Sequence, residues 1–206
     1  MIRGNNTYDF NYLAIKCESK KMNKLKHHLV LGELKDFLTG KIIEDNHDER
    51  LRQKLTRFLV EEKEYEKENI TSQIKIIVRA GENKAIVKVD FKVRILEKTC
   101  LVIKYGPGSL VTRQRPSLAA SRLIEPYQIP FVVVTNGIDG EILDGISGKI
   151  IGKNLGAIPS RSEVFDQWDH LDFKSISAKR VEVESRILYA YEVDDACPCD
   201  ENICRL

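Results

Sequence analysis

An aspartate and a lysine on neighbouring predicted strands are the residues of this chain best suited to chemistry. Residues 85–95 alternate between apolar and polar side chains and place Asp90 on the polar face, and residues 100–105 carry Lys104 on the same face as Val102. Hydrolysis of a phosphodiester uses a divalent ion to activate water, and a nearby lysine can stabilise the negative charge that develops. Because Mg²⁺ prefers oxygen ligands, we expect it at Asp90.

A predicted helix upstream carries two polar side chains that could join this pair. We expect the helix to begin near residues 45–47, where a short polar side chain can cap the free backbone N–H groups. Glu49 and Gln53 lie one turn apart, so that both can point into the site; the alternative is an exposed side of the helix. The buried stripe is predicted from apolar residues at helical spacing: Leu51, Leu55, Phe58 and Leu59.

The order of the predicted elements indicates an α/β fold with a mixed sheet flanked by helices. Three strands are followed by a helix with Pro116 in its first turn and then by an apolar strand over residues 131–134. A helical crossover makes this last strand parallel to the strand before it. We expect an N-terminal arm over residues 1–44, a core over 45–160 and a C-terminal part over 161–206.

The C-terminal part is predicted to contain two helices and a tail with cysteines. One helix is expected around residues 163–171 and the other over 178–192. The second helix is expected to turn four apolar residues inward: Val181, Ile187, Leu188 and Tyr191.

Four segments together resemble a known family of nuclease domains. Residues 49–53, 88–91, 101–104 and 129–137 are similar to the N-terminal domain of type I restriction enzyme R subunits (HsdR). The resemblance implies the PD-(D/E)xK restriction-endonuclease-like fold and magnesium-dependent cleavage of DNA. It also implies catalytic roles for four residues of this chain: Glu49, Gln53, Asp90 and Lys104.

One residue departs from the pattern of this family. Val102 stands where the family has a glutamate two residues before the lysine, and a valine cannot bind a metal ion. Three explanations are open. Glu49 supplies the second carboxylate, or a displaced one does so, with Glu125 preferred over Glu97. Otherwise the site is inactive and the fold serves as a nucleic-acid-binding module.

Three cysteines near the C-terminus predict a second metal centre. Cys197, Cys199 and Cys204 lie within ten residues of one another, and both structural zinc and iron–sulfur clusters favour four thiolates. We expect Cys17 to be the fourth ligand. Cys100 is the alternative, although its place on a strand is typical of an ordinary buried thiol.

One cysteine before the core and three after it resembles the iron–sulfur subgroup of RecB-like nucleases. That resemblance implies a [4Fe–4S] cluster, with Zn²⁺ as the alternative, which would join the two ends of the chain. The other interpretation is an acidic tail that contains cysteines by chance. A cluster without nuclease activity would indicate a role in electron transfer or sensing.

Basic side chains around the predicted site favour DNA as the partner. A phosphate-binding groove is predicted from five residues: Lys88, Lys92, Arg113, Arg115 and Arg122. The net charge is only +2, so any basic surface must be local. We also consider a partner protein or a homodimer.

The composition is that of a globular protein outside the membrane. Hydrophobic residues make up 42% of the 206 residues, but no apolar run approaches the roughly 20 residues that span a bilayer. The N-terminus has no apolar signal stretch, and a cytoplasmic location is expected.

Overall fold

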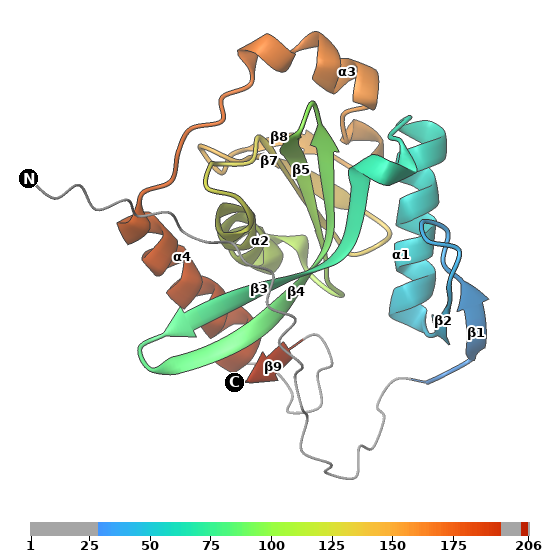
Figure 1. Cartoon of the computed structure of the whole chain (residues 1–206), viewed down its shortest axis with the longest axis horizontal. Coiled ribbons are helices and arrows are strands. Elements are labelled where there is room, and N and C mark those ends of the chain that lie inside the picture. Colours follow the sequence, from blue (N-terminus) through green and yellow to red (C-terminus); the bar gives the residue numbers. More distant parts are fainter. Residues whose placement is uncertain (1–28, 195–202, 206) are drawn as a thin grey trace, which may run out of the picture.

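The computed structural model describes residues 29–194 and 203–205, and its strands form two sheets (Figure 1). The small sheet is a hairpin of β1 (Gly32–Lys35) and β2 (Ile42–Asp45). The large sheet has seven strands: β3 (Ile70–Ala80), β4 (Asn83–Ile95), β5 (Lys98–Tyr105), β6 (Phe131–Thr135), β7 (Gly140–Asp144), β8 (Ile150–Lys153) and β9 (Ile203–Arg205).

The large sheet is mixed, as predicted. Its strands follow the order β3-β4-β5-β6-β7-β8, and β9 pairs with β4 beside this row. Only the pairing of β5 with β6 is parallel, because α2 (Leu110–Ile124) crosses over between them. The predicted α/β class is therefore confirmed.

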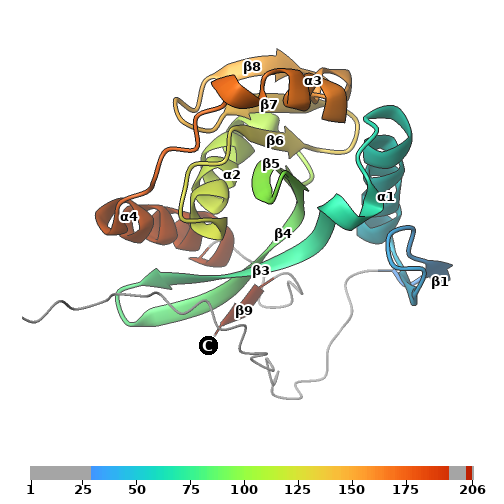
Figure 2. The same cartoon turned by 45° about the horizontal axis from the view of Figure 1, so that its top comes forward.

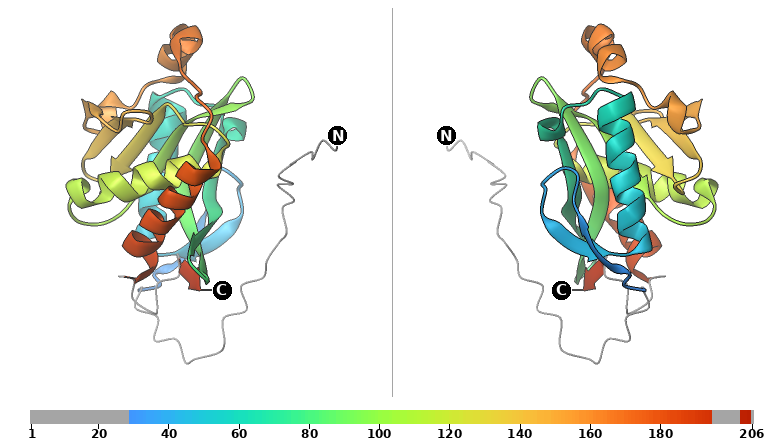
Figure 3. Two further views of the ribbon diagram at one scale, coloured as in Figure 1. Left: turned by 90° about the vertical axis from the view of Figure 1, so that its left-hand side faces the viewer. Right: turned by 90° about the vertical axis from the view of Figure 1, so that its right-hand side faces the viewer.

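Helices cover both faces of the large sheet (Figure 3). One face carries α1 (His47–Arg57), whose Leu55 packs with Phe91 and Ile103 in one apolar cluster. The other face carries α2 and α4 (Ala178–Tyr189), where Val102 and Leu188 belong to a second cluster. The short helix α3 (Arg161–Asp166) precedes α4. No helix among the described residues is both long and apolar enough to cross a bilayer.

The strands β4 and β5 part within the sheet, and this fork positions the predicted catalytic residues. Their backbone pairing ends at Phe91 and Ile103, whereas Lys104 still pairs with β6. Farther along β4, β9 takes the edge that β5 has left, with Val87 opposite Ile203 (Figure 2). A fork between two strands leaves room for side chains that a continuous ladder would not allow.

The N-terminus of α1 follows the prediction, and that of α2 differs from it. Asn46 caps α1, since its side chain accepts a hydrogen bond from the N–H of Glu49 at 2.8 Å. By contrast, α2 begins at Leu110, so that Pro116 lies inside the helix rather than in its first turn. Pro116 is buried, and packing of α2 against the sheet compensates for the hydrogen bond that proline cannot make.

The inward face of α4 was predicted only in part. Leu188 is fully buried, but Val181 is 38% exposed and Tyr191 is 50% exposed. Glu184 is buried in the helix instead, because the guanidinium groups of Arg115, Arg122 and Arg180 surround its carboxylate at 2.6–2.7 Å. Burial alone would raise the pKa of Glu184, but its hydrogen bonds to Arg115 and Arg122 outweigh this effect and lower it.

Candidate functional site

Asp90 and Lys104 face each other across the fork between β4 and β5. Phe91 pairs with Ile103, and the same antiparallel register continued by one residue sets Asp90 opposite Lys104. The Asp90 carboxylate accepts a hydrogen bond from the backbone N–H of Tyr105 at 2.7 Å. The period-two alternation of both strands therefore predicted correctly that these two side chains share a face.

Arg52 links Asp90 to the predicted helix glutamate. One guanidinium nitrogen of Arg52 lies 3.5 Å from Asp90 Oδ1, and another lies 2.9 Å from Glu49 Oε2. Glu49 is buried and also accepts a hydrogen bond from the amide of Gln53 at 2.9 Å. Glu49 and Gln53 thus belong to the polar group beside Asp90, and sequence reasoning missed Arg52 as the residue between them.

Gln53 also holds the β1–β2 hairpin on α1. Its amide nitrogen donates to Asp36 Oδ1 at 2.7 Å, and its amide oxygen accepts from the N–H of Phe37 at 2.7 Å. Burial would raise the pKa of Asp36, but hydrogen bonds from Thr39 and Gln53 outweigh it and hold this pKa below its usual value. The contacts of Gln53 favour a supporting role over direct contact with a substrate.

A glycine at the end of β6 sets the position of α1. Gly137 has φ +87°, a conformation that disfavours other residues, and a Cβ added there would lie 2.5 Å from the side chain of Leu51. Leu51 is next to Arg52 in the helix. The Thr-Asn-Gly segment therefore allows α1 to approach the sheet closely enough for Arg52 to reach Asp90.

A carboxylate from the C-terminal part reaches the lysine, and sequence reasoning did not anticipate it. Glu192 lies in the π-helical turn η5 (Ala190–Asp194), and its Oε2 accepts a hydrogen bond from Lys104 Nζ at 3.0 Å. Both side chains are nearly buried, with 8% exposure for Lys104 and 13% for Glu192. The two residues are 88 positions apart, so no local pattern pointed to their contact.

The carboxylates considered as displaced ligands lie elsewhere. Glu125 accepts hydrogen bonds from Thr99 Oγ1 at 2.6 Å and from Lys92 at 3.3 Å, at the opposite end of β5 from Lys104. Glu97 is 93% exposed and pairs with Arg94 in the β4–β5 turn. Neither side chain contacts Asp90 or Lys104.

Charges of opposite sign alternate through the site. Three carboxylates and two cations follow one another in the order Glu49, Arg52, Asp90, Lys104 and Glu192. Burial raises the pKa of Asp90, against the lowering effects of Lys104, the N–H of Tyr105 and Arg52. With all five groups ionised, the net charge is −1, which favours a cation over an anion.

The donor set fits a magnesium ion in chemical type, although no cage is preformed. Among residues 29–194 and the short β9 strand, no three His, Cys, Asp or Glu side chains are grouped closely enough to hold a metal ion. Mg²⁺ commonly keeps several waters and needs only one or two carboxylates. Asp90 offers one such oxygen ligand. Val102 offers none because its side chain is a hydrocarbon, and it is fully buried in the apolar cluster under α2 and α4.

Ion pairs within the molecule engage Lys92, Arg115 and Arg122 of the five predicted phosphate-binding residues. Lys92 pairs with Glu125 at 3.3 Å, while Arg115 and Arg122 pair with Glu184. Arg122 is only 5% exposed and also donates to the carbonyl oxygens of Gly145 and Ile146, which leaves no surface for a phosphate. The sequence around Arg122 did not predict that this side chain is buried.

Arg113 and Lys88, the other two predicted residues, are partly exposed. Arg113 packs over Gly106 in the loop after β5 and donates to the carbonyl of Pro107 at 3.3 Å. Lys88 is partly exposed on the same face of β4 as Asp90. These two residues fit the predicted phosphate contacts better than Arg122 does.

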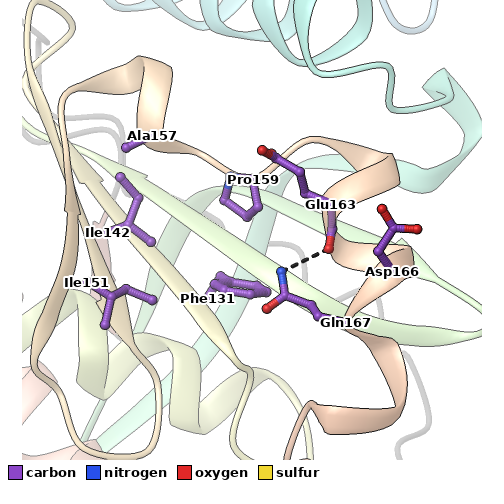
Figure 4. Close-up of a pocket in the computed structure, with 8 residues that line it drawn as sticks. All are labelled: Phe131, Ile142, Ile151, Ala157, Pro159, Glu163, Asp166 and Gln167. Atoms are coloured by element: carbon purple, nitrogen blue, oxygen red, sulfur yellow. Dashed lines mark hydrogen bonds between the residues drawn. The ribbon is translucent and has the colours of Figure 1, made fainter.

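One cavity adjoins the candidate site, and another lies away from it. A cavity of about 150 Å³ is lined by Glu49, Arg52 and Gln53 together with Gln73. A larger one of about 440 Å³ has Ile142, Ile151 and Ala157 on one side and Glu163, Asp166 and Gln167 on the other, with Phe131 and Pro159 between them (Figure 4). The two acidic residues at its margin make the larger cavity unsuited to a nucleic-acid phosphate.

The predicted cysteine centre falls mostly outside the described residues. Cys17, Cys197 and Cys199 lie there, and only the backbone pairing of Cys204 with Ile86 is described. Cys100 is fully buried, and burial raises the pKa of its thiol to about 12. The interpretation of Cys100 as an ordinary buried thiol is confirmed.

Comparison with protein families decides the relationship. Residues 47–159, more than half of the chain, match the type I restriction enzyme R protein N terminus family. The chain belongs to this family. The matched segment of the chain contains α1 and β3 to β8, and hence Glu49, Asp90 and Lys104. The β1–β2 hairpin, α4 and Glu192 lie outside it. No curated protein and no solved structure gave a significant match.

Proposed function

We propose that this protein is a metal-dependent DNA endonuclease with a PD-(D/E)xK-type centre at Asp90 and Lys104. The observation that carries the proposal is the juxtaposition of these two side chains at the fork between β4 and β5, inside the segment that matches the restriction-enzyme family. An aspartate and a lysine on adjacent strands can supply a metal ligand and a charge-stabilising group for phosphodiester cleavage.

Each residue of the centre has a separate task in this reaction. Asp90 would hold Mg²⁺, which when bound supplies activation of water and charge neutralisation at the phosphate. Lys104 would stabilise the negative charge that develops on the phosphate oxygens. Arg52 holds the Asp90 carboxylate in place from α1, and Glu49 in turn fixes the guanidinium of Arg52.

DNA is the proposed substrate, and the surface contacts would be made by cations. Arg113 and Lys88 flank the fork and could bind backbone phosphates, which give affinity without reading sequence. Such binding weakens with salt, and the logarithm of the binding constant falls by about 0.9 per phosphate contact for each unit of log salt.

A second candidate function is a catalytically inactive DNA-binding module of the same fold. The specific observation in its favour is Val102, which has 0% exposure and packs with apolar side chains at the position of the family's glutamate. A protein with this function would bind DNA in a salt-dependent manner without cutting it.

Cleavage assays on labelled single- and double-stranded DNA with Mg²⁺ or Mn²⁺ test the proposal. We expect cleavage by the wild type, and a loss of at least a hundredfold in Asp90→Asn and Lys104→Met. Glu97→Gln is the matched control, because Glu97 is a carboxylate on the same β4–β5 unit with 93% exposure. Salt-dependent binding without any cleavage would reject the endonuclease and favour the second function.

A further inference from the structure

Glu192 occupies the side of Lys104 that the missing carboxylate leaves without a charge partner. In the family pattern a glutamate at position 102 would share the strand face of Lys104, but this chain has a buried valine there. Glu192 approaches the same lysine to 3.0 Å from η5. A carboxylate is therefore present at the lysine, and it comes from a different part of the chain.

The turn that carries Glu192 is anchored rather than loose. It continues directly from α4, and the next residue, Val193, has 0% exposure in the cluster that also contains Val102 and Leu188. The turn contacts both β4 and β9. Wide π-type turns are rare within helices and occur frequently at functional sites.

The electrostatics around Glu192 leave capacity for a cation. Lys104 is shared between two carboxylates, Asp90 and Glu192, and the five charged groups of the site together carry a net charge of −1 when all are ionised. Oε2 of Glu192 accepts the hydrogen bond from Lys104, and a carboxylate has a second oxygen that can bind a cation.

We propose that Glu192 is the second carboxylate ligand of a divalent cation held with Asp90, in place of the residue lost at Val102. This inference rests on the proposed function, and it assigns the cation a ligand outside the matched family segment. Two carboxylates are sufficient for Mg²⁺, which retains water at its remaining positions. Glu125 and Glu97 cannot take this role, because they lie away from the lysine.

Isothermal titration calorimetry of the full chain with Mn²⁺ measures the binding directly. We expect Glu192→Gln and Asp90→Asn each to weaken Mn²⁺ binding by at least tenfold. Glu192→Asp keeps the charge but shortens the side chain, so we expect a loss of several-fold if the carboxylate is a ligand. Glu182→Gln, which changes a 71% exposed carboxylate on α4, should bind as the wild type does.

The outcomes separate this inference from the proposed function. If Glu192→Asp binds Mn²⁺ like the wild type, Glu192 acts at most through its charge and the inference is overturned. Loss of Mn²⁺ binding in Asp90→Asn would still leave the endonuclease proposal standing. If the wild type binds no Mn²⁺, both fall. Thermal melting of each variant shows whether it is folded; if Glu192→Gln does not fold, Glu192→Asp alone decides.

Discussion

Val102 is the residue at which this chain departs from the pattern that the proposed nuclease function predicts. It is fully buried and packs in one cluster with Ala119, Ala120 and Ile129, and Lys92 is its partner across the β4–β5 ladder. A glutamate at this position would carry its charge toward apolar neighbours on α2. The neighbours of Val102 are apolar and match a valine, so the absence of a carboxylate at this position is not an isolated change.

Restoring the family's glutamate should therefore cost stability. We expect Val102→Glu to lower the free energy of unfolding by about 3 kcal/mol or more, since it buries a charge among apolar side chains while the nearby Lys92 and Lys104 are already paired with Glu125 and Glu192. Val111→Glu should change it by less than about 0.5 kcal/mol, because Val111 is 69% exposed on α2. Urea titration measures both. A stable Val102→Glu protein with tighter Mn²⁺ binding would contradict this account.

At the scale of elements, the approach of α1 to the end of β6 governs the site. Arg52 reaches Asp90 only because α1 lies close to the sheet, and Leu51 packs directly on Gly137. The β1–β2 hairpin is attached to the other side of α1 through Gln53. The helix is thus fixed from both sides, and a change at Gly137 should be transmitted to Arg52.

A pair of glycine substitutions tests this coupling. Gly137→Ala should destabilise the protein and reduce Mn²⁺-dependent cleavage at least tenfold, because an added Cβ would lie 2.5 Å from Leu51 and push α1 outward. Gly81→Ala is the control: its φ is also positive, at +60°, but nothing lies within 4 Å of an added Cβ. It should show only the backbone cost of about 1–2 kcal/mol. Equal effects of both substitutions on cleavage would exclude the role of α1.

The sequence predicted those parts of the site that local patterns encode. Alternation identified the shared face of Asp90 and Lys104, and a capping residue identified the start of α1. Glu192 could not be found in this way, because its contact depends on the packing of α4 against β3 and on the π-helical turn. Arg115 and Arg122 were interpreted as surface cations, since their partner Glu184 is distant in sequence and lies on another helix.

At the scale of the whole molecule, elements from outside the matched family segment complete the core. The helix α4 packs on α2 and β3, and β9 occupies the edge of β4 beyond the fork. The backbone of Cys204 lies in β9, so one of the predicted metal-binding cysteines is attached to the sheet that carries Asp90. A metal centre at the cysteines stays a prediction. If it forms, one of its predicted ligands lies on a strand of the large sheet.

Metal analysis of anaerobically purified protein tests that prediction. We expect iron and sulfide, with a brown colour that Cys17→Ala and Cys197→Ala abolish and that Cys100→Ala retains. Cys100 is fully buried in the apolar cluster under α1. Colourless protein that contains one zinc per chain would indicate a zinc site instead of an iron–sulfur cluster. Absence of both metals would support the interpretation of an acidic tail.

The pairing of Lys104 with Glu192 has a consequence for biosynthesis. The ribosome adds Glu192 88 residues after Lys104, and no contact can form before both partners have been made. A nascent chain that has already folded β4, β5 and β6 would thus lack this carboxylate. If Glu192 is needed for cutting, the nascent chain cannot cut DNA before Glu192 has been added.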